Sequence, residues 1–448
     1  MSTMKTDILI VGGGPAGILA GMSAKMTNPK LNVTLIKKER GVTIKCSEPY
    51  VLGGILKLKD IIFPDKMITD AGINLLIDEA VKVDTSKKIV ITKKKKIVYK
   101  KLIFATGANP FVPPIPGKDL KNVFTLRTSE DVKKIQTSMN VSKNIVIIGG
   151  GAIGIELASL LVRNKKNVTI IEILPHLVYG AYDEEFSKTV ENTLKKCGVK
   201  VLTGESVKEI RGKGKAEVII TNSSKRIRAD IVLFTTGVRS ETKLAKEAGI
   251  KIGKFGIWTK GTMETSIKDI YACGDCAQAI HFITRKPTPS QLATTAVFQG
   301  KIAGTNSAGM KNQFRGVVNP AVSAFCEVAI GRAGLTEKQA KEEKFKVVVG
   351  EAESFNKYPY HPGAKKLRIK LTFDRKTKRI LGAQIFGGQE GVSQRINLLS
   401  LAIYNRMKIE DIIKLNYCAH PELTPLPFAE PVVMAAEDAL KKITSNIN

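Results

Sequence analysis

Two glycine-rich segments of the sequence have the residue types and the spacing that bind a dinucleotide. Each follows a strand-like apolar run and opens a helix-like segment, one over residues 12–17 and the other over residues 149–154. Such glycines permit a tight turn and let the backbone approach a pyrophosphate at a helix N-terminus, where free N–H groups favour negative charge. Two sites imply two dinucleotides and electron transfer between them. The glycines are Gly12, Gly14, Gly17, Gly149, Gly151 and Gly154.

A single cysteine, Cys46, follows the first segment and is our candidate for receiving the electrons. It precedes helix-like sequence in IKCSEPYVLGG and follows Lys45. A helix N-terminus and a neighbouring cation both favour the reactive thiolate. No second cysteine follows four or five residues later, so this thiolate would form a mixed disulfide, a persulfide or a sulfenate. The alternative is a buried structural cysteine.

The acidic residue that ends the second strand of such a unit usually binds the adenosine ribose. In the second unit this residue is Glu172. Its charge should repel a 2′-phosphate, so we predict NADH over NADPH, although the nearby His176 and lysines leave NADPH open. In the first unit the same position is Lys37, and Glu39 two residues later is the candidate. The alternative for Glu39 is an ordinary surface charge.

The stretch Cys273-x-x-Cys276 has the spacing of a redox pair or of half a zinc site. No second pair lies at a suitable distance, so we predict no metal site. The six cysteines of the chain are few and scattered, unlike the disulfide framework of a secreted protein.

The order of expected elements indicates an α/β fold with two Rossmann-like dinucleotide-binding domains and a C-terminal α+β domain. Residues 1–36 read as strand, turn, helix and strand, and a proline-rich connector follows at 110–117. We also expect an antiparallel meander at 75–105 with Lys93–Lys96 at a hairpin tip, and a helix from Pro289 to Ala308. The expected domains are the first at 1–112 and 250–321, the second at 113–249, and the C-terminal domain at 322–448.

Composition limits the class of protein. The chain has 71 basic and 41 acidic residues, a net charge of +30, and 43% apolar residues. No apolar run reaches the ~18 residues of a membrane span, and the N-terminus enters a strand with no room for a signal peptide, so we expect a cytoplasmic protein. The charge makes an anionic ligand plausible. Aromatic residues are not interleaved with basic ones, so nucleic acid is not the expected partner.

The segment Ala105-Thr106-Gly107 and the stretch around Asp275, together with both glycine segments, resemble the FAD- and NAD-binding pyridine nucleotide–disulfide oxidoreductases along nearly the whole chain. The resemblance implies an FAD domain, an inserted NAD(P) domain, a return to the FAD domain and a dimerisation domain. It also implies that Asp275 contacts the ribityl chain of the flavin. The cofactor-binding residues are Gly12, Gly14, Pro15, Ala16, Gly17, Glu39, Ala105, Thr106, Gly107, Gly149, Gly151, Ile153, Gly154, Glu172, Gly237, Gly274 and Asp275.

The pattern Cys-x-x-Pro-Tyr-x-x-Gly-Gly, which begins at Cys46, resembles the branch with coenzyme A–disulfide reductases, persulfide or polysulfide reductases and some NADH oxidases. In that branch tyrosines of the partner subunit reach the cysteine, which implies a homodimer. Tyr417 is the best match and Tyr360 a weaker one. His420 is a competing candidate for the proton donor, since histidine titrates near neutral pH.

These observations predict an FAD-dependent NAD(P)H oxidoreductase that reduces a low-molecular-weight disulfide, persulfide or polysulfide through Cys46. Coenzyme A disulfide is favoured because its many phosphates suit the +30 charge. The alternative is an NADH oxidase that reduces oxygen while Cys46 cycles through a sulfenate. A third hypothesis, a basic flavoprotein that binds nucleic acid or a membrane surface, is disfavoured by both glycine segments and Cys46.

Overall fold

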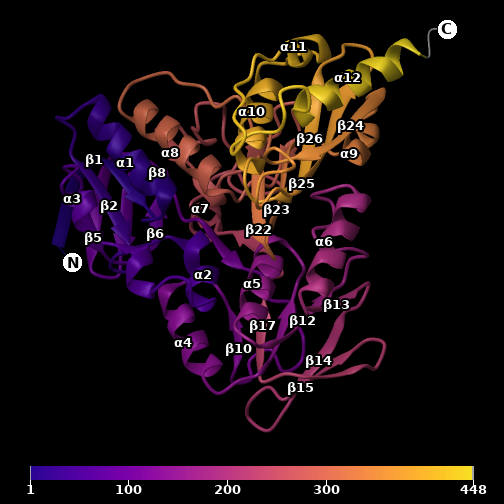
Figure 1. Ribbon diagram of the computed structural model, residues 1–448. Coiled ribbons are helices and arrows are strands. Elements are labelled where there is room, and N and C mark those ends of the chain that lie inside the picture. Colours follow the sequence, from indigo (N-terminus) through magenta and orange to yellow (C-terminus); the bar gives the residue numbers. More distant parts are fainter. Residues whose placement is uncertain (1, 446–448) are drawn as a thin grey trace.

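The computed structural model describes residues 2–445, which form three lobes, each built on its own main sheet (Figure 1). The sheet of the first lobe has the order β5 (Asn74–Ile77), β2 (Val33–Lys37), β1 (Ser2–Val11), β8 (Lys95–Phe104), β7 (Ile89–Thr92) and β6 (Ala80–Asp84), with β19 (Ile270–Ala272) paired to β8. The pairs that β1 makes with β2 and β8 are parallel, as is the pair of β19 with β8. The chain therefore leaves this sheet and returns to it much later.

Three expectations for this lobe need correction. The meander consists of β6, β7 and β8, whereas β5 pairs in parallel with β2 and extends the doubly wound sheet. The hairpin tip is residues 93–94, because β8 already begins at Lys95. The helix expected from Pro289 begins at Ala293, since the chain remains extended through Leu292 after the β20–β21 pair. These two strands are β20 (Ala279–Ile280) and β21 (Pro287–Thr288).

Helices α1 (Pro15–Thr27) and α8 (Ala293–Ser307) lie side by side in the first lobe (Figure 1). A Cβ at Gly300 would lie 2.3 Å from Ala16 O, and one at Gly304 would lie 2.1 Å from Ala20 O. Glycine is required at both positions because the two helix backbones touch there. The short elements of this lobe are β3 (Val42–Thr43), η1 (Lys45–Ser47), α2 (Glu48–Leu52), η2 (Leu58–Ile61), β4 (Ile62–Phe63), α3 (Lys66–Thr69), α7 (Lys243–Glu247) and η3 (Gly274–Cys276).

The second lobe has a parallel sheet in the order β10 (Val123–Thr125), β17 (Ile231–Phe234), β11 (Asn144–Ile148), β12 (Asn167–Glu172) and β13 (Lys200–Thr203). Its other elements are α4 (Ser129–Met139), α5 (Ala152–Arg163), α6 (Glu184–Lys196), β14 (Val207–Arg211), β15 (Val218–Thr221) and β16 (Arg226–Arg228). The chain enters and leaves this lobe through β9 (Ala108–Pro110) and β18 (Val238–Ser240), which pair antiparallel. The connection between the first two lobes is therefore double-stranded.

The third lobe has an antiparallel sheet in the order β22 (Ala321–Phe325), β23 (Val328–Gly334), β26 (Ile380–Gly388), β25 (Lys366–Asp374) and β24 (Val347–Phe355). Its helices are α9 (Glu337–Glu342), α10 (Val392–Tyr404), α11 (Ile409–Ile413) and α12 (Pro431–Thr444). None of the helices between residues 2 and 445 combines the length and the apolar character needed to cross a bilayer.

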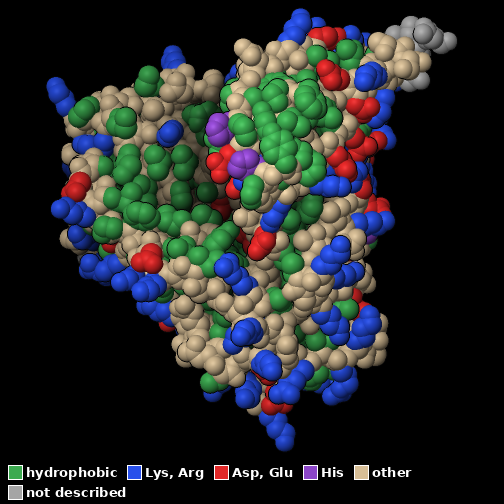
Figure 2. Space-filling view, viewed as in Figure 1, with side chains coloured by type: hydrophobic (Ala, Val, Ile, Leu, Met, Phe, Trp, Pro, Cys, Tyr) green, Lys and Arg blue, Asp and Glu red, His purple; other side chains and the backbone are tan. Residues whose placement is uncertain are grey.

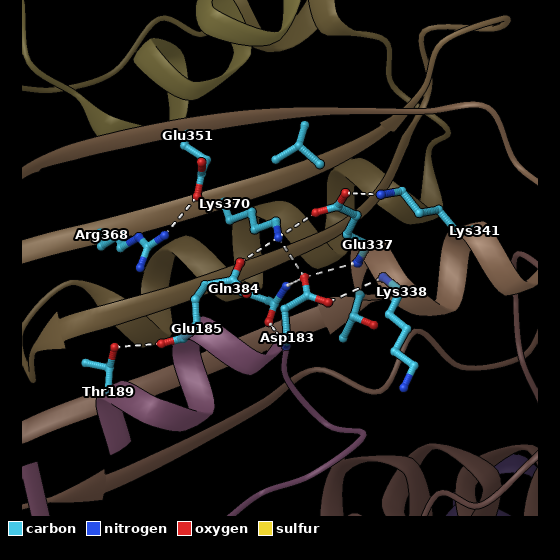
Figure 3. Close-up of polar contacts among 12 residues, drawn as sticks. Asp183, Glu185, Thr189, Glu337, Lys338, Lys341, Glu351, Arg368, Lys370 and Gln384 are labelled. Carbon is cyan, nitrogen blue, oxygen red and sulfur yellow. Dashed lines mark hydrogen bonds and ion pairs between the residues drawn. The ribbon is translucent and has the colours of Figure 1, made fainter. Parts of the chain in front are cut away.

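A buried lysine joins the third lobe to the second (Figure 3). Lys370 of β25 lies 2.6 Å from Glu185 of α6, 2.7 Å from Glu337 of α9 and 3.0 Å from Asp183, which precedes α6. Gln384 Nε2 donates to Asp183 Oδ2 at 2.6 Å, and Asp183 N donates to Gln384 Oε1 at 2.7 Å. Separating this buried cation from its carboxylates would cost free energy, so the ion pairs hold the second and third lobes in one arrangement.

Candidate dinucleotide-binding and thiol site

The first glycine turn packs against the end of β8. Gly12 has φ +120°, and a Cβ there would lie 2.0 Å from Ala105 O. A Cβ at Gly17 would lie 2.0 Å from Gly12 O. Gly14, the N-cap of α1, has open space around it and provides no side-chain cap. The N–H groups at the start of α1 therefore face a space that a pyrophosphate can enter.

The second glycine turn repeats this geometry. Gly149 has φ +109°, and a Cβ there would lie 2.6 Å from Thr235 O. A Cβ at Gly154 would lie 2.2 Å from Gly149 O, whereas Gly151, the N-cap of α5, again has open space. The apolar side chain of Ile153 in the first turn of α5 is exposed. This helix start likewise has room for a dinucleotide.

Glu172 lies directly behind the second glycine turn. Its side chain is buried, and its two oxygens accept hydrogen bonds from Gly150 N at 2.6 Å and Leu174 N at 2.8 Å. A carboxylate has lone pairs beyond these two bonds. Glu172 therefore has the position and the remaining acceptor capacity that the predicted contact to a ribose hydroxyl needs.

In the first unit, the position equivalent to Glu172 holds Lys37, whose charged group pairs with an aspartate. Lys37 is buried behind Gly13, and its Nζ forms an ion pair of 2.7 Å with Asp65. Glu39 is exposed, and it adds negative charge near Lys45. The ribose contact of Glu39 stays a prediction.

The predicted cofactor segments of the first lobe meet where β1, β8 and β19 end. Ala105 N donates to Val11 O at 2.8 Å, and Cys273 N donates to Phe104 O at 2.9 Å. A Cβ at Gly274 would lie 2.7 Å from the Cβ of Ala16. The segment 105–107, the first glycine turn and Asp275 thus lie together at the carboxyl edge of one sheet. This edge is the usual place for a ligand in such folds.

Thr106 and Gly237 connect this edge to the double-stranded link between lobes. Thr106 Oγ1 donates to Glu241 O at 2.6 Å, and Phe111 N donates to Gly237 O at 2.9 Å. Gly107 and Gly237 both have positive φ, +75° and +89°. The structure therefore places Gly237 in the link itself rather than in either glycine turn.

Cys273 and Cys276 are fully buried. Cys276 Sγ donates to Cys273 O at 3.3 Å, and burial raises the pKa of both thiols. Between residues 2 and 445 there is no cluster of three or more His, Cys, Asp or Glu residues able to hold a metal ion. Both cysteines therefore act as packing residues rather than as thiolates.

Cys46 lies on the one-turn helix η1, which leads directly into α2, and its side chain is exposed. The loop after α2 is held by the second lobe, where Asn164 Nδ2 donates to Gly53 O at 2.8 Å. A Cβ at Gly53 would lie 2.9 Å from the side chain of Leu160 on α5. The exposed thiol therefore sits where the first lobe meets the helices of the second.

Several charged side chains act on Lys45, the residue before Cys46 in the sequence. Arg127 Nη2 lies 3.6 Å from Asp275 Oδ2. Burial, and after it the charge of Arg127, lowers the pKa of Lys45, while Glu48 and Asp275 oppose that shift. Lys45, next to the predicted thiol in the sequence, and the predicted flavin-binding Asp275 thus share one electrostatic environment with Arg127.

Glu48 stands out in this group because its carboxyl group is 2% exposed. Within the described part of the chain its Oε1 has no hydrogen-bond partner. Burial raises its pKa to about 7, although Lys45 and Arg127 act in the opposite direction. A carboxyl group that titrates near neutral pH can take up or release a proton there.

Sequence reasoning did not identify Arg127 or Glu48. Thr128 and Asp131 form a capping box at the start of α4, with Asp131 N donating to Thr128 Oγ1 at 3.1 Å. That pattern marks a helix start, but it does not reveal that the preceding Arg127 faces Asp275. Glu48 could have been noticed as an acid within a segment that folds against an apolar surface.

The predicted proton donors lie on the third lobe. His420 is exposed and Tyr417 is half-buried; the Tyr417 hydroxyl donates to Pro427 O, and Glu422 N donates to His420 Nδ1 at 3.2 Å. Within residues 2–445, no hydrogen bond, ion pair or ring contact joins Tyr417, His420 or Tyr360 to Cys46.

Apolar side chains are exposed around these candidates. Hydrophobic side chains gather on the third lobe beside histidines, at the edge of a hollow that faces the first lobe (Figure 2). Tyr360, Leu423 and Phe428 are 76%, 71% and 80% exposed. An uncovered apolar surface of this kind is typical of a protein interface.

Comparisons with known proteins agree over nearly the whole chain. Residues 6–300 match the family model described as pyridine nucleotide-disulphide oxidoreductase, and residues 320–427 match its dimerisation domain. An NADH oxidase of Methanocaldococcus jannaschii is 37% identical over 98% of this chain and 99% of its own. An NAD(P)H sulfur oxidoreductase (CoA-dependent) of Pyrococcus abyssi is 33% identical over 97% of this chain and 98% of its own. The structure of an NAD-dependent persulfide reductase from A. fulgidus superposes with a TM-score of 0.93, at 29% identity over 99% of this chain and 84% of that chain.

Proposed function

Because the chain belongs to the pyridine nucleotide-disulphide oxidoreductase family, we propose that it reduces a low-molecular-weight disulfide, persulfide or polysulfide through the thiol of Cys46. The observation that carries the proposal is the exposed position of Cys46 next to Lys45, whose pKa responds to the charges of Arg127 and Asp275. The chain is an oxidoreductase that uses FAD and NAD(P)H, and its fold class is the predicted one.

The residues present fit both cofactors. The first glycine turn, Thr106 and Asp275 would hold FAD, because Gly14 leaves open space in front of uncapped N–H groups. The second glycine turn and Glu172 would hold NADH. FAD, when bound, accepts a hydride from the nicotinamide and supplies two electrons at the thiol.

The chain's own residues carry the sulfur chemistry. The thiolate of Cys46 attacks one sulfur of the disulfide, an S–S bond forms to Cys46, and the other sulfur leaves as a thiolate that takes a proton. Lys45, next to Cys46 in the sequence, and Arg127, whose charge acts on Lys45, would supply the positive charge that favours a thiolate. Two electrons from NADH then cleave the mixed disulfide and release the second thiol. The sum is one disulfide, one NADH and one proton converted to two thiols and NAD⁺.

Coenzyme A disulfide is the favoured substrate. Its phosphates suit a protein of net charge +30, because such a field concentrates anions. The name of the Pyrococcus relative supports a role for coenzyme A in this branch. Polysulfide remains a second substrate of the same class.

We further propose that the enzyme is a homodimer in which the third lobe of one subunit completes the site of the other. The dimerisation-domain match and the exposed apolar side chains of this lobe support this arrangement. Tyr417 of the partner subunit, or His420 of the partner subunit, would then protonate the leaving thiolate at Cys46.

A second candidate function is supported by the 37% identical relative named NADH oxidase. In this case oxygen is the electron acceptor and Cys46 cycles through a sulfenate. The same residues would bind the cofactors in both cases, so the two functions differ only in the electron acceptor that reaches the thiol and the flavin.

The deciding experiment is anaerobic NADH consumption by the FAD-loaded protein with coenzyme A disulfide and then with polysulfide. We expect turnover that is lost in Cys46→Ser and kept in Cys197→Ser, a matched change at another exposed cysteine. Absence of anaerobic turnover, with rapid NADH loss once air is admitted, would assign the protein as an oxidase.

A further inference from the structure

We propose that Cys197 and Cys326 form a second thiol site, independent of Cys46, which a low-molecular-weight disulfide converts to a protein disulfide joining the second lobe to the third. The two residues are far apart in the sequence: Cys197 ends a helix of the second lobe, and Cys326 lies in a turn of the third. Neither belongs to the dinucleotide or thiol site described above.

The backbone holds each cysteine at the end of an ordered element. Cys197 is the C-cap of α6; its N–H donates to Thr193 O and Leu194 O at 3.1 Å each, and its side chain is exposed. Cys326 lies in the tight turn between β22 and β23, with φ +46°, and Glu327 follows with φ +60°. Both positions are defined by secondary structure rather than by a long loop.

The β22–β23 turn reaches into the second lobe. Cys326 N donates to Ser159 Oγ of α5 at 2.7 Å. Cys326 also packs on the apolar cluster that contains Leu194 and Val199, the residues on either side of Cys197. A Cβ at Gly198, the residue after Cys197, would lie 3.5 Å from Val162 Cγ1 on the same helix α5, and the side chain of Cys197 acts on the thiol of Cys326. Both cysteines therefore border one helix, where their thiols are placed to form a bond.

The surroundings give the two thiols different roles. Burial, followed by the contact with Cys197, raises the pKa of Cys326 to about 12, so this thiol stays protonated at neutral pH. Cys197 is the exposed one, and access favours it as the first to react. Cys326 is partly buried behind it and is placed as the resolving thiol.

The chemistry balances with the substrate class proposed above as the oxidant. Cys197 attacks one sulfur of the small disulfide, forms a mixed disulfide and releases one thiol. Cys326 then loses its proton as its sulfur attacks the sulfur of Cys197, so the Cys197–Cys326 bond forms and the second small thiol leaves with that proton. Two protein thiols are oxidised, one small disulfide is reduced, and the two thiol protons pass to the two products.

The test uses the full-length, FAD-loaded Cys46→Ser protein, so its outcome does not depend on whether Cys46 is the reducing thiol. The protein is incubated with coenzyme A disulfide, alkylated under denaturing conditions and digested with trypsin. We expect a peptide of residues 197–200 joined to residues 316–332, which disappears on reduction. The exposed Cys418 is the internal control and should form mixed disulfides without this partner.

A second readout is thermal unfolding. Oxidation should raise the unfolding midpoint by roughly 5 °C, because the bond closes a long loop, and Cys197→Ser or Cys326→Ser should abolish the rise. Activity of the reduced single variants in a Cys46-intact background should be unchanged. Recovery of both peptides singly alkylated, or of Cys197 carrying only coenzyme A, would overturn the proposal.

Discussion

Lys370 Nζ lies 3.0 Å from Asp183 Oδ2, an ion pair between β25 of the third lobe and the residue that precedes α6 of the second. Both side chains are buried. Burial alone would lower the pKa of Lys370, but its bonds to Glu185, Glu337 and Asp183 raise it well above the usual value. Since α6 follows the strand that carries Glu172, this pair connects the proposed nucleotide lobe to the proposed dimerisation surface.

Replacing Lys370 should weaken the contact between these lobes. In Lys370→Met three carboxylates remain without their buried cation, so we expect a loss of about 3–5 kcal/mol in unfolding free energy. Lys341→Met is the matched control, because Lys341 also pairs with Glu337 but is exposed. Urea denaturation of both variants measures the difference, and equal small losses would show that the buried lysine has no special role.

Glu48 should make stability depend on pH. Its pKa of about 7 in the folded protein exceeds the ordinary 4.5, so the folded state binds the proton more tightly than the unfolded state. Stability contributed by the protonated form is therefore present at low pH and is lost as pH rises from about 4.5 to 7. Glu48→Gln should remove this decline and raise the unfolding free energy by about 3 kcal/mol at pH values above the folded-state pKa of about 7. Denaturation curves across the pH range measure it. Glu39→Gln, at an exposed carboxyl group, should retain the decline.

The two glycines at the start of the first turn should respond differently to alanine. Gly12→Ala places a methyl group 2.0 Å from Ala105 O at φ +120°, so we expect loss of FAD and of folded protein. Gly14→Ala meets open space, so the fold should persist while FAD binding weakens where the phosphate would lie. Flavin absorbance per protein, together with circular dichroism, distinguishes these outcomes. Full flavin content in Gly14→Ala would argue against a pyrophosphate at this position.

A mixed dimer tests whether the proton donor comes from the partner subunit. Neither Cys46→Ser nor Tyr417→Phe should give full activity as a homodimer. When one subunit carries Cys46→Ser and the other Tyr417→Phe, one intact Cys46 faces an intact Tyr417, so about half of the wild-type rate per dimer should return. Tandem affinity purification of differently tagged subunits isolates this species. A mixed dimer no faster than the Tyr417→Phe homodimer would place the donor elsewhere, and the same design applies to His420.

Local sequence patterns were sufficient to predict the structure at positions where the backbone conformation restricts the residue type. The glycine turns are readable because Gly12 and Gly149 need positive φ and because neighbouring carbonyl oxygens leave no room for a Cβ. The apolar runs predicted the strands that precede these turns, and the fold class is confirmed. The exact start of α8 and the pairing of β5 were wrong, since each depends on the strand beside it.

The sequence by itself determined the α/β fold, the two glycine turns and the choice of Cys46, because these depend on residue types at short spacing. Only the tertiary structure brought Arg127 to Asp275, buried Glu48, set Lys370 among three carboxylates and placed Cys197 against Cys326. Each of these contacts joins residues that packing brings together from separate elements. Their strength comes from burial and from the exclusion of water, which no short stretch of sequence records.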